Sequence, residues 1–147
     1  MRIPILAATV ALVLSSQSSA SAADCPSAVT AAALEAHAGA TVASCKPERE
    51  DGKTHYEVKL TTYHRQEIEL DISPDGDILV TEADVELGEV PQAVMTAFHA
   101  KYAGVKPRRA EKQIASDGKV TYELKLAGGA KKREATFTAE GDFVEEE

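Results

Sequence analysis

Three stretches of the chain alternate between apolar and polar residues, one position at a time. The alternation runs through residues 55–60, 67–72 and 121–126. A period of two is typical of strands in an antiparallel sheet with one buried and one polar face. The short sequences "EDGK", "PDGD", "SDGK" and "AEGD" lie between such stretches and favour turns. The pattern predicts hairpins whose apolar side faces a core and whose polar side faces solvent or a partner.

Two other stretches, residues 26–39 and 91–104, carry apolar residues at helical spacing. Val29 and Ala33 lie one turn apart in the first, and apolar residues occupy the same offsets in the second. Each begins with proline, which suits the first turn of a helix, and ends at glycine, which suits its C-terminus. We therefore expect a helix over each stretch, with its apolar stripe packed on the sheet.

These segments recur in the same order, 65 or 66 residues apart. The segment "PSAVTAAALEAHAGA" aligns with "PQAVMTAFHAKYAGV", "DGKTHYEVKL" with "DGKVTYELKL", and "DISPDGDILVTE" with "TFTAEGDFVEEE". Together 16 of 37 aligned positions are identical, which is far above chance. We predict an α+β fold of two tandem repeats, residues 23–86 and 87–147, each a helix followed by a four-stranded antiparallel sheet.

The first 22 residues have the pattern of a secretory signal peptide. Arg2 is followed by an apolar run from Ile3 to Leu14, and Ala20 and Ala22 suit the small-residue cleavage site. The run is shorter than the roughly 20 residues that a bilayer-spanning helix needs. We expect cleavage after Ala22, a periplasmic or secreted location, and no membrane insertion of the mature chain.

The net charge indicates which partners to expect, and the cysteines indicate the redox state of the compartment. Loss of Arg2 with the leader changes the net charge of the chain from −8 to −9. An acidic chain repels phosphate backbones, so nucleic acid is not an expected partner. The two cysteines, Cys25 and Cys45, lie in the mature chain, where an oxidising compartment favours a disulfide. Such a bridge would stabilise the fold by roughly 3 kcal/mol.

Residues 71–82, "DISPDGDILVTE", resemble an EF-hand calcium loop in their spacing. The candidate oxygen ligands are Asp71, Ser73, Asp75, Asp77 and Glu82. An EF-hand needs a helix on both sides of the loop, whereas the residues before this segment have strand periodicity. The equivalent segment of the second repeat begins with Thr136 but keeps the turn sequence. A hairpin turn is the favoured interpretation, and calcium binding is the alternative.

The remaining residues form no recognisable catalytic group. The serines lack a nucleophile elbow, no phosphate-binding loop is present, and the histidines lack metal-ligand spacing. We expect neither an enzyme nor a cofactor. The polar strand face and one hairpin loop supply the candidate partner contacts, which are His55, Glu57, Lys59, Tyr63, Glu67 and Glu69. Lys59 is expected to face Glu67 or Glu69 across a hairpin, and Lys125 to face Glu134.

With the repeat laid out, the chain resembles a known family. The Val-Pro helix start, the "AFHAKY" helix, the "GKVTYELKL" strand and the acidic Gly-Asp turn resemble the PepSY-like domain of the β-lactamase-inhibitor-protein-like group. The first repeat is more divergent, with Ala33 and His37 at the positions of Phe98 and Tyr102. The resemblance implies a small exported protein with helices on a curved antiparallel sheet, of a kind that binds or restrains other proteins. We therefore expect a non-enzymatic module that binds an unidentified protein partner, and the resemblance implies an inhibitor-like role toward it.

Overall fold

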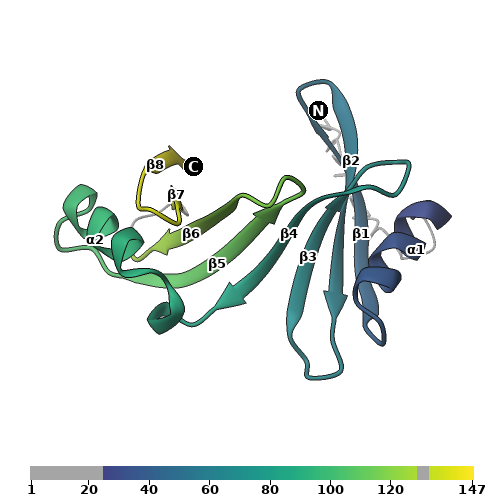
Figure 1. Ribbon diagram of the computed structural model, residues 1–147, viewed down its shortest axis with the longest axis horizontal. Coiled ribbons are helices and arrows are strands. Elements are labelled where there is room, and N and C mark those ends of the chain that lie inside the picture. Colours follow the sequence, from purple (N-terminus) through teal and green to yellow (C-terminus); the bar gives the residue numbers. More distant parts are fainter. Residues whose placement is uncertain (1–24, 129–132) are drawn as a thin grey trace, which may run out of the picture.

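The elements follow one another in the order helix, four strands, helix, four strands (Figure 1). The computed structural model describes residues 25–128 and 133–147, so the predicted leader at residues 1–22 lies outside the described residues. The elements are α1 (Ser27–Ala36), β1 (Thr41–Glu50), β2 (Lys53–Thr61), β3 (Glu67–Ile72), β4 (Ile78–Val85), the 3-10 helix η2 (Leu87–Glu89), α2 (Gln92–Lys101), β5 (Pro107–Ala115), β6 (Val120–Leu126), β7 (Glu134–Thr138) and β8 (Phe143–Glu146). The predicted helices and the alternating strands are present where the sequence pattern placed them.

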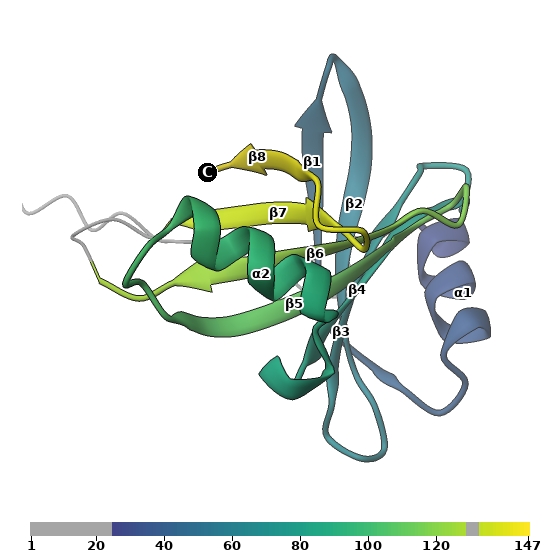
Figure 2. The same ribbon diagram turned by 60° about the vertical axis from the view of Figure 1, so that its left-hand side comes forward.

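All eight strands belong to one antiparallel sheet in the order β1 to β8, so each strand pairs with its neighbours in the sequence. The two halves of the chain are joined where β4 pairs with β5, from Val80 opposite Ala115 to Val85 opposite Ala110. The sheet twists strongly between its ends, with α1 near one end and α2 near the other (Figures 1 and 2). The predicted α+β fold with an antiparallel sheet is confirmed, and the sheet runs through both halves without a break.

Both helices lie on the same face of the sheet. This follows from the strand register, since directly opposite residues in neighbouring strands point to the same side of a sheet. Leu70, in the core beneath α1, lies opposite Thr81, and Val85 on the same side of β4 lies opposite Ala110, in the core beneath α2. The first core contains Val29, Ala33, Cys45, Val58, Leu60, Leu70 and Ile72. The second contains Val90, Val94, Phe98, Tyr102, Ala110, Tyr122, Leu124, Leu126, Ala135 and Phe137. The opposite face of the sheet carries no helix of the described chain, and we call it the helix-free face.

The segment that resembled a calcium loop is the hairpin turn between β3 and β4. The Ser73 backbone N–H donates to the Asp77 carbonyl at 2.8 Å, and the Asp77 N–H donates to the Ser73 hydroxyl at 3.0 Å. Thr138 and Asp142 make the same two contacts between β7 and β8, at 2.8 and 3.1 Å. The predicted turn is confirmed, and the Ser73 hydroxyl has a structural task within it.

Both turns require glycine, for its backbone conformation and for its lack of a side chain. Gly76 and Gly141 have φ angles of +97° and +94°, which L side chains rarely adopt. A Cβ atom at Gly76 would lie 3.1 Å from the Ala28 carbonyl oxygen, and one at Gly141 would lie 2.7 Å from that of Ala93. Each turn therefore touches the backbone of the helix that opens its own half.

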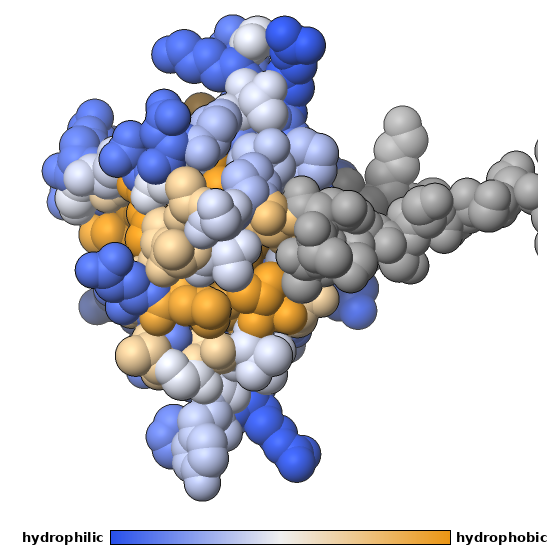
Figure 3. Space-filling view, turned by 90° about the vertical axis from the view of Figure 1, so that its right-hand side faces the viewer, coloured by the Kyte–Doolittle hydropathy of each residue, from blue (hydrophilic) through white to orange (hydrophobic). Residues whose placement is uncertain are grey.

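The predicted disulfide between Cys25 and Cys45 is present, with the two Cα atoms 5.8 Å apart. It ties Cys25, two residues before α1, to the middle of β1, and the Cys45 side chain lies in the first core. Neither α1 nor α2, nor any other helix in the described ranges, has the length and hydropathy to cross a membrane. The α1 end of the molecule shows hydrophobic surface between hydrophilic hairpins (Figure 3).

Candidate partner-binding face

The helix-free face is hollowed along its middle, over a volume of about 510 Å³. Its charged lining comprises nine carboxylates and three cations, namely Glu57, Glu67, Glu69, Glu82, Asp84, Glu111, Glu123, Glu134 and Glu147 with Lys59, Arg109 and Lys125. We call this set the acidic hollow. Residues from both halves of the chain contribute to it, because β4 and β5 hold the halves in one sheet.

Strand alternation places these charges on one face. Val58 and Leu60 are fully buried beneath α1, so Glu57 and Lys59 must point to the other side of β2. Lys59 lies opposite Glu69, and its Nζ atom is 2.7 Å from a Glu69 carboxylate oxygen. Glu57 lies 3.6 Å from the same Nζ atom. The predicted cross-strand pair of Lys59 is confirmed with Glu69, and its hydrogen bond raises the pKa of Lys59.

An equivalent group of charges lies in the second half, 65 or 66 residues later. Lys125 lies opposite Glu134, as predicted, and its Nζ atom is 3.4 Å from the Glu134 carboxylate. Glu123 lies 3.7 Å away, and Glu111 on β5 is closer still at 3.1 Å. Burial alone would lower the pKa of Lys125, but the hydrogen bond and charge of Glu111 raise it. Each lysine is therefore held by carboxylates of its own half.

Carboxylates also face one another directly across neighbouring strands. Glu69 lies opposite Glu82, and Glu111 lies opposite Glu123. Like charges in such positions repel and destabilise a sheet. Burial, followed by the charges of Glu69 and Asp71, raises the pKa of Glu82 to about 7. Burial and the charges of Glu134 and Glu111 likewise raise the pKa of Glu123 to about 7.

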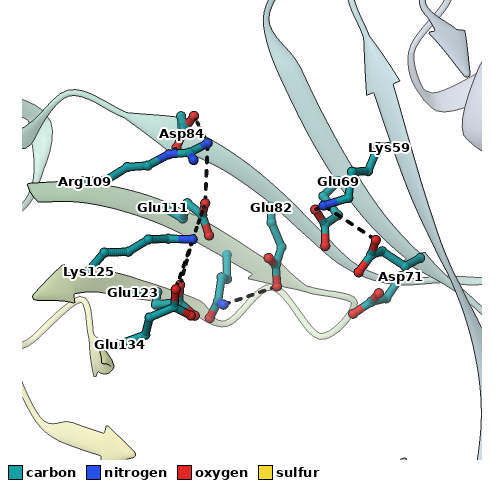
Figure 4. Close-up of polar contacts among 12 residues, drawn as sticks. Lys59, Glu69, Asp71, Glu82, Asp84, Arg109, Glu111, Glu123, Lys125 and Glu134 are labelled. Carbon is teal, nitrogen blue, oxygen red and sulfur yellow. Dashed lines mark hydrogen bonds and ion pairs between the residues drawn. The ribbon is translucent and has the colours of Figure 1, made fainter. Parts of the chain in front are cut away.

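Glu82 lies at the centre of this arrangement, between the Lys125 group and the Lys59 group (Figure 4). The Gln113 side-chain amide donates to the Glu82 carboxylate at 3.2 Å, and the Thr121 hydroxyl donates to the amide oxygen of Gln113 at 2.8 Å. Across the ranges 25–128 and 133–147, no cationic nitrogen lies within 4 Å of the Glu82 carboxylate. Among these residues, the hydrogen bond that holds the half-buried Glu82 carboxylate comes from a neutral donor.

The third cation, Arg109, lies beside the strands that join the two halves. Its guanidinium donates two hydrogen bonds to Asp84 on β4, and Glu111 lies 3.7 Å away. A second, larger hollow of about 700 Å³ adjoins this pair and extends to η2 and the loop between β2 and β3. Arg109 and Asp84 line both hollows, so the two share this ion pair in their walls.

Four of the six candidate partner contacts line the acidic hollow, namely Glu57, Lys59, Glu67 and Glu69. His55 lies further along the same face of β2, and its Nε2 atom is 3.7 Å from both Glu48 and Asp71. Tyr63 lies outside the hollow, in the loop between β2 and β3. It is 89% exposed, with its ring edge-on to that of His64 at 5.5 Å. The strand alternation thus placed the four strand residues on the helix-free face, and the role of all six residues as partner contacts stays a prediction.

The residues from the second half and the central Glu82 were not among the predicted partner contacts. Lys125 and Glu134 were expected to pair, but their place beside the first half depends on the pairing of β4 with β5. The candidate calcium ligands are divided between two environments. Asp71 and Glu82 lie in strands on the helix-free face, whereas Asp75 and Asp77 lie at the turn. Within the described residues, no group of three or more possible ligands could hold a metal ion.

Comparison with known proteins agrees with this architecture. Residues 26–86 match the PepSY family, described as the peptidase propeptide and YPEB domain. The match spans α1 and β1 to β4, so the first half of the chain is similar to a PepSY domain. A candidate periplasmic protein from Bacteroides eggerthii shares the fold with 18% identity and a TM-score of 0.65, over 83% of this chain and 87% of that one.

A BLIP-like protein from Bacteroides fragilis is similar over 82% of this chain and 83% of its own, with 19% identity and a TM-score of 0.58. At such identities these likenesses establish the fold alone. They extend beyond the PepSY domain to most of the two-helix, eight-stranded structure, which confirms the predicted PepSY-like and β-lactamase-inhibitor-like fold. A search of curated protein sequences gave no match.

Proposed function

We propose that this chain is an exported, non-enzymatic module that binds a protein partner through its helix-free face. The observation that carries the proposal is the acidic hollow, a concave surface about 510 Å³ in volume to which both halves of the sheet contribute. The helices cover cores on the other side, so this face has no packing task within the described chain. We further propose that residues 23–86 and 87–147 are tandem copies of one PepSY-like unit.

The family likeness supports a binding role. The PepSY family takes its description from peptidase propeptides, and one protein of the same fold is BLIP-like. Binding rather than catalysis also suits the chemistry of the hollow, where carboxylates of its own half hold each lysine in ion pairs. The exposed ring of Tyr63, four residues before Glu67 in the chain, is the kind of aromatic group that often anchors a protein interface. In this proposal the partner covers the hollow and contacts the loop that carries Tyr63.

Site-specific photo-crosslinking tests where a partner binds. A photoreactive phenylalanine derivative would replace Glu67, which is exposed and lines the hollow, or Ala31, which is exposed on the outer side of α1. Mature protein carrying either residue would be irradiated with the exported proteins of the producing cell. We expect a discrete crosslinked partner from position 67 and none from position 31. Crosslinking from α1 alone, or from neither site, would contradict the proposal.

A further inference from the structure

The acidic hollow holds more negative charge than its own cations neutralise. Nine carboxylates and three cationic side chains line it. Lys59 is within 4 Å of two carboxylates, Lys125 of three, and Arg109 of Asp84 and Glu111. Every cation of the hollow is therefore already shared among acidic neighbours. Among the described residues no further cation lines the hollow, so protons or a group from elsewhere would neutralise the remaining negative charge.

Glu82 is the position where an outside cation would be most favourable. The other half-buried carboxylates of the hollow each have a lysine or arginine nitrogen within 4 Å, whereas for Glu82 the described residues provide only the Gln113 amide. Charged and titratable groups surround it from the neighbouring strands, namely Glu57 and Lys59 on β2, Glu69 and Asp71 on β3, Glu111 on β5, Glu123 and Lys125 on β6 and Glu134 on β7. Carboxylates outnumber cations among them, so a cation placed on Glu82 is attracted by the whole group.

We propose that the hollow accepts a segment of a partner protein that places a lysine or arginine side chain on Glu82. This inference rests on the proposed function and specifies the chemistry of the partner. A cation on Glu82 would form a charge-assisted hydrogen bond and would offset the repulsion between Glu69 and Glu82. A protein segment suits the site better than a single ion, because the hollow extends over several strands and the described residues include no metal-ligand cluster.

Binding of this kind would release protons. Because the pKa of Glu82 in the free protein is about 7, a fraction of the molecules carries a proton on this group at neutral pH. A bound cation favours the ionised carboxylate, so the proton is expelled as the complex forms. The affinity should consequently rise between pH 6 and pH 8, a range in which lysine and arginine remain charged.

The test uses a defined probe, a capped hexalysine peptide, with the mature chain and isothermal titration calorimetry at low salt. Glu82→Gln removes the central carboxylate. Glu50→Gln, at the exposed end of the β1–β2 hairpin, changes the net charge equally and serves as the matched control. We expect Glu82→Gln to weaken hexalysine binding three- to tenfold and Glu50→Gln to weaken it less than twofold. Wild-type binding should tighten from pH 6 to pH 8, and this dependence should be weaker in Glu82→Gln, where Glu123 still has a pKa of about 7.

Two results would overturn the inference. Equal weakening by both variants would mean that hexalysine responds only to the net charge of the protein. Absence of binding, or binding that does not tighten with pH, would mean that Glu82 accepts no cation. Either result is distinguishable from failure of the proposed function, because crosslinking from position 67 reports a partner on this face whatever its charge. Circular dichroism of each variant would establish that it is folded.

Discussion

The two halves of the chain build the same elements around different cores. No aromatic side chain is among the fully buried residues of the first core, whereas Phe98, Tyr102, Tyr122 and Phe137 dominate the second. Their strands nevertheless pair in the same way, with Cys45 opposite Val58 in one half and Ala110 opposite Leu124 in the other. The comparison shows that this fold fixes where the buried positions lie and leaves open how each is filled.

The two halves place their large buried side chains on different elements, one on the sheet and the other on the helix. The first half has the small Ala33 on the helix and the large Leu70 on the third strand, and the second half has Phe98 and Ala135 at the corresponding positions. A large residue on one side is therefore matched by a small one on the other, as dense packing requires. The spacing between helix and sheet can then stay similar while the residues change.

The smaller first core has a covalent connection that the second lacks. Cys25 and Cys45 form a disulfide, and the residues 65 positions later, Val90 and Ala110, are simply buried apolar groups. A core without buried aromatic rings buries less apolar area, and a disulfide offsets this by limiting the freedom of the unfolded chain. The halves differ in their means of stabilisation, and both leave the helix-free face available.

The largest loss of stability is expected when the Phe98 ring is removed from the second core. Phe98→Ala should reduce the free energy of unfolding by about 3–5 kcal/mol, because it leaves a cavity beneath α2. Adding Ala135→Leu would copy the pairing of Ala33 with Leu70 and should restore part of the loss. Urea denaturation of the single and double variants measures both effects. A double variant less stable than Phe98→Ala would contradict the exchange of volume between helix and sheet.

Loss of the disulfide should have the next largest effect. The double variant Cys25→Ala, Cys45→Ala should lower the free energy of unfolding by roughly 3 kcal/mol, because the bridge closes a loop in the unfolded chain. Hydrogen exchange should show that α1 and β1 lose protection before α2 and β5. Equal loss of protection in both halves would contradict a stabilising role confined to the first core.

The two turn glycines offer a comparison at equivalent positions. Gly76→Ala should cost roughly 1–2 kcal/mol, because alanine must adopt a positive φ angle. Gly141→Ala should cost more, since its Cβ atom would meet the Ala93 carbonyl at 2.7 Å rather than at 3.1 Å. Thermal denaturation of both variants shows which one loses more stability. A smaller effect at Gly141 would show that the turn moves away from the helix without cost.

The smallest expected effect is a gain in stability, when the Glu82 carboxylate is removed. The pKa of Glu82 is raised in the folded protein, so ionisation of this carboxyl destabilises the fold. This destabilisation is absent below about pH 4.5 and complete above about pH 7. Glu82→Gln should therefore stabilise the protein at pH 8, on the order of 1 kcal/mol because partial exposure screens the charges, and have no effect near pH 4. Denaturant unfolding at both pH values measures the difference. Destabilisation at pH 8 would indicate that the ionised carboxylate is favourable where it lies.

Local periodicity was sufficient to predict the two helices, the strands β2, β3 and β6, and the division of these strands into an apolar and a polar face. The turns were predicted from their own sequences, and the remaining strands from the repeat. The alternation around Val58 and Leu60 already placed Glu57 and Lys59 on the partner side. The pairing of β4 with β5 could not be predicted in this way, because α2 and η2 separate these strands and no hairpin turn marks their register. Glu82 was consequently considered as a ligand of a calcium loop, whereas the structure places it at the centre of the acidic hollow.

The central claim is that the helix-free face holds carboxylate repulsion that a cationic partner relieves. Its most direct test is the pH titration of the Glu82 side-chain carboxyl by carbon-13 NMR, without and with hexalysine. We expect a midpoint of about 7 in the free protein and a lower midpoint in the presence of the peptide. A midpoint near the ordinary glutamate value under both conditions would contradict it.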